Sequence, residues 1–191
     1  MSAGVAGAHR SDEPAWVGDV LDFWFGMPED LWWRKDAGFD DRIRARFLAL
    51  HESLLAGGGH GIASPRAALA AVIALDQFGR NMFRGDPRAY AADPVARKIA
   101  LDAIDAGRDA GMAKDERLFL YMPLQHSEDV ADQRRAVALV AALGDAELTH
   151  FAEAHCRIIE RFGRFPHRNG ILGRASTAEE EASLQEPMGR F

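Results

Sequence analysis

The stretch that decides the fold covers residues 36–57 and reads DAGFDDRIRARFLALHESLLAG. Its apolar side chains recur at steps of three and four residues, at Phe39, Ile43, Phe47, Leu50 and Leu54. This spacing places them on one face of an α-helix. Asp36 can cap the first turn, and the glycines from Gly57 onward end the pattern. The stretch therefore predicts an amphipathic helix that packs one face against a core.

Similar start and stop signals recur along the rest of the chain. They predict helices over residues 15–25, 65–78, 94–106, 114–121, 128–143 and 146–162, and a short last helix after Thr177. No stretch alternates polar and apolar residues as a strand would, so the sequence predicts an all-α fold. The short loops favour about eight helices in antiparallel pairs, stacked upon one another rather than arranged as a four-helix bundle.

Small polar residues and prolines mark several helix ends. Ser64 and Asp93 each precede a proline, and this order is typical of a cap followed by the first helical turn. Ser127 should cap the helix over residues 128–143, with two acidic residues in its first turn. Pro123 should end the helix predicted over residues 114–121, because proline cannot donate a helical hydrogen bond.

Composition places this chain among ordinary globular proteins. Its 191 residues suit a single domain, which we expect over residues 15–191 behind a mobile tail over residues 1–14. A net charge of -6 gives no reason to bind nucleic acid or anionic lipid. The single Cys156 gives no sign of an oxidising compartment, and no apolar run is long enough to span a membrane. We therefore expect a cytoplasmic protein.

Polar side chains occupy otherwise apolar helical faces at five positions. These are Asp76, Asp129, Asp132, Gln133 and His155. Asp76, for example, follows Leu69 and Val72 on one stripe of its helix. We expect Asp76, His155 and at least one of the other three to be buried. Because an unpaired buried carboxylate is costly, we also expect an arginine to contact Asp76.

Unusual polar residues concentrate in three segments, over residues 76–81, 125–129 and 164–169. Each breaks a local rule at a helix end or turn, which is expected at functional sites. We predict that they converge, so that His126, His167 and Arg168 line the same pocket as Asp76 or Arg80. The candidate binding residues are Asp76, Arg80, Asn81, His126, Glu128, Asp129, Gln133, His155, Arg164, His167, Arg168 and Asn169.

A purely structural explanation exists for each of these residues. Polar residues at a helix start are what capping and the helix dipole select, so residues 127–129 favour structure when taken alone. His155 lies on an apolar helical face, as does a core histidine whose hydrogen bonds are made within the protein. Asp76 with an arginine can be an ion pair that fixes one arrangement of helices. The functional interpretation depends on the accumulation of such residues in three distant segments.

Three strings carry a family resemblance. The stretches LDQFGRNMFRG (75–85), YMPLQHSEDVADQ (121–133) and RFGRFPHRNGILGR (161–174), followed by STAEE, closely resemble the bacterial family catalogued as domain of unknown function 924. The likeness extends from Val20 to about Glu181. Gly79 is a departure, because the family usually has proline there. The resemblance implies a tetratricopeptide-like helical fold and carries no assigned activity.

Three functions are compatible with these residues. In the first, Arg80, Arg164 and Arg168 bind a small anionic molecule or a peptide, because guanidinium groups suit carboxylate and phosphate. In the second, His126 or His167 performs acid–base catalysis beside a carboxylate, for example as a hydrolase. In the third, the polar network only supports a scaffold. We place ligand binding first, the scaffold second and catalysis third.

Sequence motifs for nucleotides, metals and serine nucleophiles do not occur. His150 and His155 are five residues apart, which separates them by about 140° around a helix and prevents them from sharing a ligand face. We therefore expect neither a metal nor another cofactor.

Overall fold

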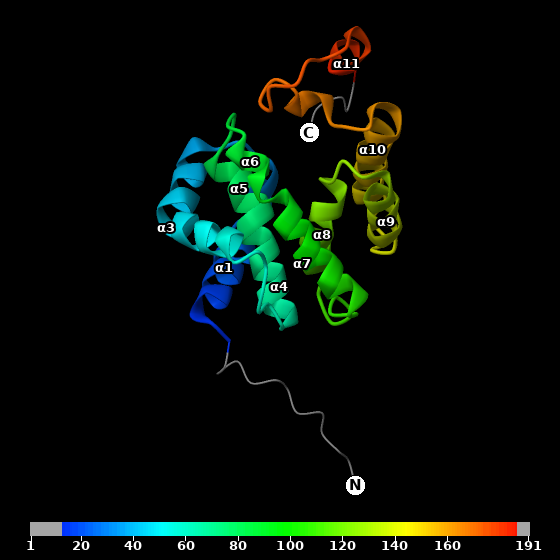
Figure 1. Ribbon diagram of the computed structural model, residues 1–191. Coiled ribbons are helices and arrows are strands. Elements are labelled where there is room, and N and C mark those ends of the chain that lie inside the picture. The colour runs from blue at the N-terminus through cyan, green and yellow to red at the C-terminus, as the bar shows by residue number, and fades with distance from the viewer. Residues whose placement is uncertain (1–12, 187–191) are drawn as a thin grey trace.

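The computed structural model describes residues 13–186, which fold into helices without a strand (Figure 1). The helices are α1 (Ala15–Phe25), α2 (Asp30–Trp33), α3 (Ala37–Ala56), α4 (Pro65–Val72), a π-helix (Ile73–Gln77), α5 (Phe78–Met82), α6 (Arg88–Ala91), α7 (Asp93–Asp105), α8 (Lys114–Gln125), α9 (Val130–Ala141), α10 (Ala146–Phe162), a 3₁₀-helix (Pro166–Arg168) and α11 (Ala178–Ser183). The predicted all-α class is confirmed, whereas the tetratricopeptide-like stacking stays a prediction.

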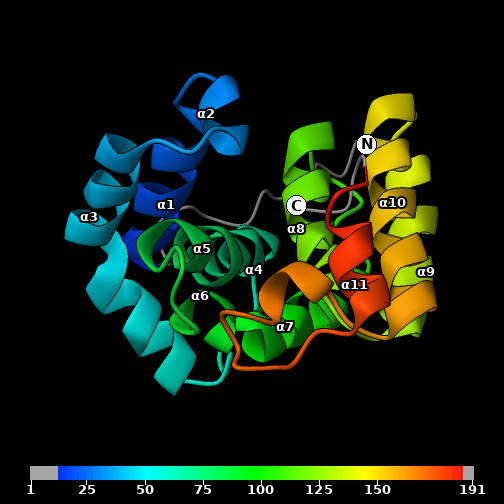
Figure 2. The ribbon, with the colours of Figure 1, turned by 90° about the horizontal axis from the view of Figure 1, so that it is seen from above.

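The most apolar part of the sequence forms the centre of the molecule. Every residue from Ala67 to Gly79 is buried, so α4 beyond its first two residues and the π-helix present no solvent-exposed face. Helices α1, α3, α7 and α8 pack around them, as Figure 2 shows from above. A helix that is apolar around its circumference has to be enclosed in this way, because each exposed apolar side would lose the free energy of burial.

Helices α8, α9 and α10 form the other side of the molecule (Figure 1). α9 and α10 pack along each other and are joined by a short loop in which Gly144 has a φ of 74°. Glycine adopts such a left-handed conformation without steric cost, which allows the chain to reverse here. Asp145 caps α10 as predicted, because its side chain accepts from the backbone N–H groups of Glu147 and Leu148.

Two predicted breaks are wrong. α8 continues through Pro123 to Gln125, because all residues from Leu118 to Gln125 are buried and their packing holds the helix despite one missing hydrogen bond. Helical structure likewise continues from Pro65 through residue 82, so the helix predicted over residues 65–78 does not end there and Gly79 lies in α5. The sequence signals also did not predict two one-turn helices, α2 and α6.

The cap of α9 is also different from the prediction. Asp129 is the N-cap, and its Oδ1 accepts from the N–H of Ala131 at 2.7 Å. Ser127 instead donates from Oγ to Asp132 at 2.6 Å and accepts from the N–H of Asp129. The helix starts two residues later than a Ser127 cap would place it, because the Ser127 hydroxyl serves a buried carboxylate.

Most of the tail predicted over residues 1–14 lies outside the described residues. Glu13, which is described, accepts from Ser64 Oγ at 2.6 Å and from Arg66 Nε at 3.1 Å, so this position contacts the start of α4. None of the helices in residues 13–186 combines the length and the hydrophobicity that crossing a lipid bilayer requires.

Candidate functional site

A π-helix places a carboxylate in the middle of the protein. Asp76 lies in this wider turn and is fully buried. Its carboxylate accepts from Gln77 Nε2 at 2.6 Å and from Arg80 Nη1 at 2.9 Å. The expected burial of Asp76 and its contact with an arginine are therefore confirmed. Turns of this kind interrupt α-helices frequently at functional sites.

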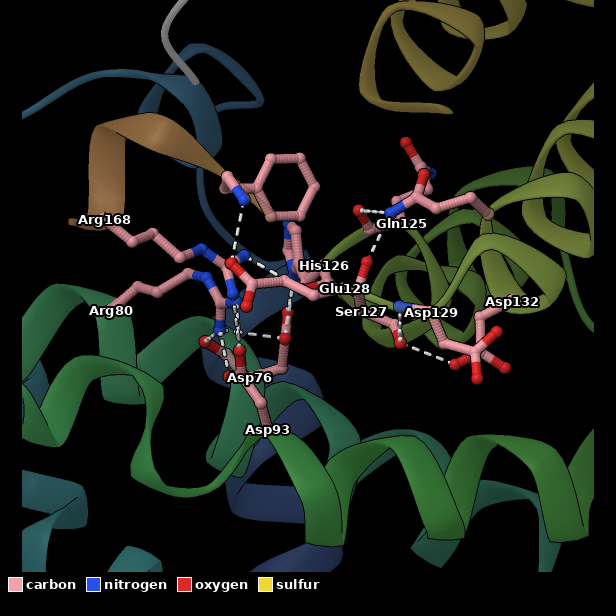
Figure 3. Close-up of polar contacts among 12 residues, drawn as sticks. Asp76, Arg80, Asp93, Gln125, His126, Ser127, Glu128, Asp129, Asp132 and Arg168 are labelled. Atoms are coloured by element: carbon pink, nitrogen blue, oxygen red, sulfur yellow. Dashed lines mark hydrogen bonds and ion pairs between the residues drawn. The ribbon is translucent and has the colours of Figure 1, made fainter. Parts of the chain in front are cut away.

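The other partner of Asp76 is a histidine from a distant segment. Nδ1 of His126, directly after α8, lies 2.8 Å from Oδ1 and 2.9 Å from Oδ2 of Asp76 (Figure 3). An ionised carboxylate only accepts hydrogen bonds, so we assign the proton to Nδ1, which leaves Nε2 unprotonated in the neutral ring. Burial raises the pKa of Asp76, but Arg80 and His126 outweigh it and hold that pKa well below its usual range. Burial and the charge of Arg80 lower the pKa of His126.

Two arginines meet at a second carboxylate, that of Asp93 at the start of α7. Arg80 donates to it from Nη1 at 3.0 Å and from Nη2 at 3.1 Å, and Arg168 donates from Nη1 at 3.3 Å. Asp93 makes no capping hydrogen bond, so the role of helix cap predicted for it is wrong. Its carboxylate offsets the repulsion between the two guanidinium groups.

Arg168 is held on several sides. Its guanidinium carbon lies 4.7 Å from the ring centre of Tyr90 and 4.5 Å from that of Phe165, and Nη2 donates to the backbone oxygen of His126 at 3.0 Å. Nε is buried without a hydrogen-bond partner among the described residues. Burial and the nearby charge of Arg80 lower the pKa of Arg168. This side chain is therefore fixed and incompletely paired.

Two further histidines complete the cluster. The ring of His155 lies 6.3 Å from that of His126, and the ring of His167 lies 5.5 Å from that of Phe165, measured between ring centres. Burial lowers the pKa of His155 to about 3. Burial, followed by the charge of Arg168, lowers the pKa of His167 to about 4. Both rings are therefore neutral at pH 7.

These groups line a cavity of about 480 Å³, within the range of small-molecule sites. Its walls are formed by Trp32, Trp33, Arg34, Lys35, Gln77, Arg80, Asn81, Arg84, Gly85, Ala89, Tyr90, His126, His155, Phe165, His167, Arg168 and Ile171. None of these lining residues is Asp or Glu. A neighbouring cavity of about 400 Å³ shares Tyr90, His126 and Arg168 with it and adds Asp93 and Glu128 to its walls.

The family model described as "Bacterial protein of unknown function (DUF924)" matches residues 20–188. The chain belongs to this family. It is also similar to a solved structure of a protein of unknown function from Agrobacterium tumefaciens, with 44% sequence identity and a TM-score of 0.86. That similarity covers 91% of this chain and 98% of the other. None of the curated proteins matches. The resemblance carried by the three sequence strings is confirmed.

The predicted convergence of the three polar segments is present in the structure. Arg80, His126, His167 and Arg168 line one cavity, and Asp76 contacts two of these residues from behind. Asn81 and His155 line the same cavity. Whether these residues act as a binding site stays a prediction.

Five of the candidate residues serve other contacts. Asp129 caps α9 and is exposed, while buried Gln133 donates from Nε2 to the backbone oxygens of residues 125 and 127. Arg164 and Asn169 both donate to Glu180 of α11 and so hold the segment that precedes this helix against it. Glu128 accepts from Arg174 at 2.7 Å and borders the neighbouring cavity.

Sequence reasoning missed several cavity residues. The string Trp32–Trp33–Arg34–Lys35 combines aromatic and basic side chains, a signal that could have indicated a binding site. Arg84 also lines the cavity, and its Nε donates to Asp40 at 2.5 Å. Tyr90 carries no sequence signal of its own. Within residues 13–186, no group of three or more His, Cys, Asp or Glu side chains is placed to bind a metal ion.

Proposed function

We propose that this protein binds a small organic anion in the 480 Å³ cavity. The observation that supports this function is the cavity's wall, which contains five Arg or Lys residues, three His residues and no Asp or Glu among the described residues. The chain as a whole carries a net charge of -6, so this distribution runs against its composition. Cationic donors gathered in a concave site favour carboxylate or phosphate.

The carboxylates that neutralise these arginines do not line the cavity. Asp76 and Asp93 hold Arg80, and Asp40 holds Arg84, yet none of the three belongs to its wall. The arginines are therefore held in place by contacts outside the site, and a guanidinium has five N–H groups with which to bind a further acceptor. Such fixed donors cost little conformational entropy when a ligand binds.

The aromatic side chains indicate which organic anions fit. Trp32, Trp33, Tyr90 and Phe165 line the same cavity as the arginines, and Trp33 is 57% exposed. Aromatic walls bind flat or apolar groups, and arginines bind the acid function. An anion with a planar carbon skeleton satisfies both, so benzoate and phenyl phosphate are suitable probes.

Binding is measured by calorimetry and by tryptophan fluorescence, with benzoate and phenyl phosphate titrated separately. Arg168→Met should weaken the preferred probe at least tenfold, because a hydrogen bond to a charged group contributes about 1.5–3 kcal/mol and tenfold corresponds to about 1.4 kcal/mol. Arg168→Lys should recover only part of the affinity, since lysine lacks the planar fork.

Arg157→Met is the matched control, because Arg157 is exposed on α10 and pairs only with Glu153 among the described contacts. It should bind like the wild type. Absence of binding of both probes to the folded wild type would exclude the proposed site. Equal losses in the two arginine variants would also contradict it.

A further inference from the structure

We infer that His126 is a general base that hydrolyses an ester of such an organic acid, an inference that rests on the proposed function. The Asp76–His126 pair carries it. Both oxygens of a fully buried carboxylate lie within 2.9 Å of Nδ1, which fixes the ring, and the imidazole contributes to the walls of both cavities. A neutral histidine oriented by a carboxylate in this manner is suited to remove a proton from a bound molecule.

The outer nitrogen of the ring is available for this chemistry. No hydrogen bond to Nε2 of His126 occurs among residues 13–186, and the side chain is 17% exposed. A histidine kept only as a structural partner of Asp76 has no need of access to a cavity. Asp76 already receives hydrogen bonds from Arg80 and Gln77, so His126 is not required to neutralise it.

The composition of the 480 Å³ cavity selects water as the nucleophile. Its described lining residues include no Ser, Thr or Cys that could form an acyl intermediate. Water can enter from solvent and needs no further co-reactant. Arg80 and Arg168 lie beside His126 and supply N–H donors for the negative oxygen of a tetrahedral intermediate.

The reaction is balanced with water alone. Nε2 of His126 takes a proton from water while its oxygen forms a bond to the ester carbonyl carbon, and the carbonyl electron pair moves onto oxygen. That pair then re-forms the C=O bond, and the C–O bond to the alcohol breaks. The proton on Nε2 passes to the departing alkoxide. One ester and one water give one carboxylic acid and one alcohol, and His126 returns to its neutral form.

Asp76 is a positioning residue in this scheme, because it touches His126 and not the ester. It holds the ring with Nδ1 protonated and stabilises the imidazolium that forms. The groups around His126 are Asp76 from the π-helix, Arg80 from α5, Asp93 from α7, His155 from α10, and Arg168 with His167 from the 3₁₀-helix. Loss of the Asp76 charge should therefore change the pH dependence of the rate and not only its size.

The experiment uses two matched 4-nitrophenyl esters with the full chain. Mono-4-nitrophenyl terephthalate carries a rigid carboxylate, and 4-nitrophenyl benzoate lacks it. The wild type should strongly accelerate hydrolysis of the first ester. Its rate acceleration for the second ester should be at least tenfold smaller. His126→Gln should lose at least about 100-fold of the catalysed rate, which is the usual contribution of a general base.

Control variants separate catalysis from folding. His60→Gln changes an exposed histidine outside the cavity and should hydrolyse the ester at the wild-type rate. Asp76→Asn should lower the rate and shift its pH profile. If His126→Gln does not fold, diethyl pyrocarbonate provides a second measurement: inactivation of the wild type should follow carbethoxylation of His126 and be slowed by benzoate.

Each result decides between the two proposals. No catalysed hydrolysis by a wild type that still binds benzoate or phenyl phosphate would overturn the general base and leave the binding site intact. Full activity in His126→Gln, or inactivation that follows another histidine, would overturn it as well. Absence of both binding and hydrolysis would remove the proposed function itself.

Discussion

Arg80 and Arg168 donate to the same carboxylate, that of Asp93, at distances of 3.0–3.3 Å. The two arginines come from distant segments of the chain, so Asp93 connects the core helices to the 3₁₀-helix that follows α10. Without that carboxylate, two adjacent positive charges would share a low-dielectric site.

Asp93→Asn should therefore destabilise the fold by about 2 kcal/mol, because it leaves charged donors incompletely paired. Urea unfolding measures the change, which should be larger at low ionic strength. Asp102→Asn on the same helix is the control. Asp102 is exposed and pairs with Lys98, so its loss should cost less than about 1 kcal/mol. Similar values for the two variants would contradict the role assigned to Asp93.

Acid should destabilise the protein over a pH window set by two histidines, His155 and His167. The pKa of His155 is lowered to about 3 and that of His167 to about 4, whereas an unfolded histidine has a pKa of about 6.5. Between these values the unfolded chain binds protons that the folded chain does not. The free energy of unfolding should therefore have its full value above about pH 6.5 and decrease as the pH is lowered toward 3–4.

His155→Gln tests the contribution of one ring, since glutamine does not titrate. The slope of the unfolding free energy against pH reports how many more protons the unfolded chain binds than the folded chain. This number should decrease by up to about one between pH 6 and pH 4. His60→Gln, at an exposed position, should keep the wild-type slope. An unchanged slope in His155→Gln would show that His155 is protonated in the folded state.

Asp129→Ala should destabilise the protein by about 1 kcal/mol, the usual cost of removing an N-cap. The reason is the hydrogen bond from the N–H of Ala131 to Asp129 Oδ1 at the start of α9. Thermal and urea unfolding both measure the change. Glu153→Ala, at an exposed position inside α10, should stay within about 0.5 kcal/mol of the wild type. No loss in Asp129→Ala would argue against this cap.

Gly79→Ala compares helix propensity with crowding. Alanine is favoured over glycine by about 1 kcal/mol inside a helix, but a Cβ at Gly79 would lie 3.2 Å from Cε1 of His51. That ring is fixed by a 2.9 Å hydrogen bond between Nδ1 and the backbone oxygen of Ala74. Gly18→Ala, where a Cβ meets nothing within 4 Å, should therefore be more stabilising than Gly79→Ala. The reverse order in urea unfolding would contradict this prediction.

Local signals in the sequence were sufficient for most of the helices. Caps such as Asp36 and Asp145 act through hydrogen bonds to the next few residues, so their effect is encoded within one turn. Pro123 was misinterpreted because tertiary packing keeps a helix that local chemistry would end. Ser127 was misinterpreted because its hydroxyl has a competing partner in Asp132.

The site could be predicted only as far as polar residues stand out against apolar stripes. Asp76 and His155 do so, and both are buried as expected. Pairing between distant segments leaves no such pattern. Neither the contact of Asp93 with Arg168 nor that of Glu128 with Arg174 can be derived from spacing, because both depend on how the helices pack. Which of several arginines pairs with a given carboxylate depends on their positions in space.

The π-helix also has a consequence for the angular phase of the residues on either side of it. A π-turn takes up about one residue more than an α-turn, so the helix after Gln77 is offset by about 100° from a continuous α-helix. Residues 65–72 can therefore follow the phase that core packing demands, while Arg80 and Asn81 follow a different phase that turns them to the cavity. Deleting one residue within 73–75 would restore a single phase and rotate the cavity side chains away without removing any of them.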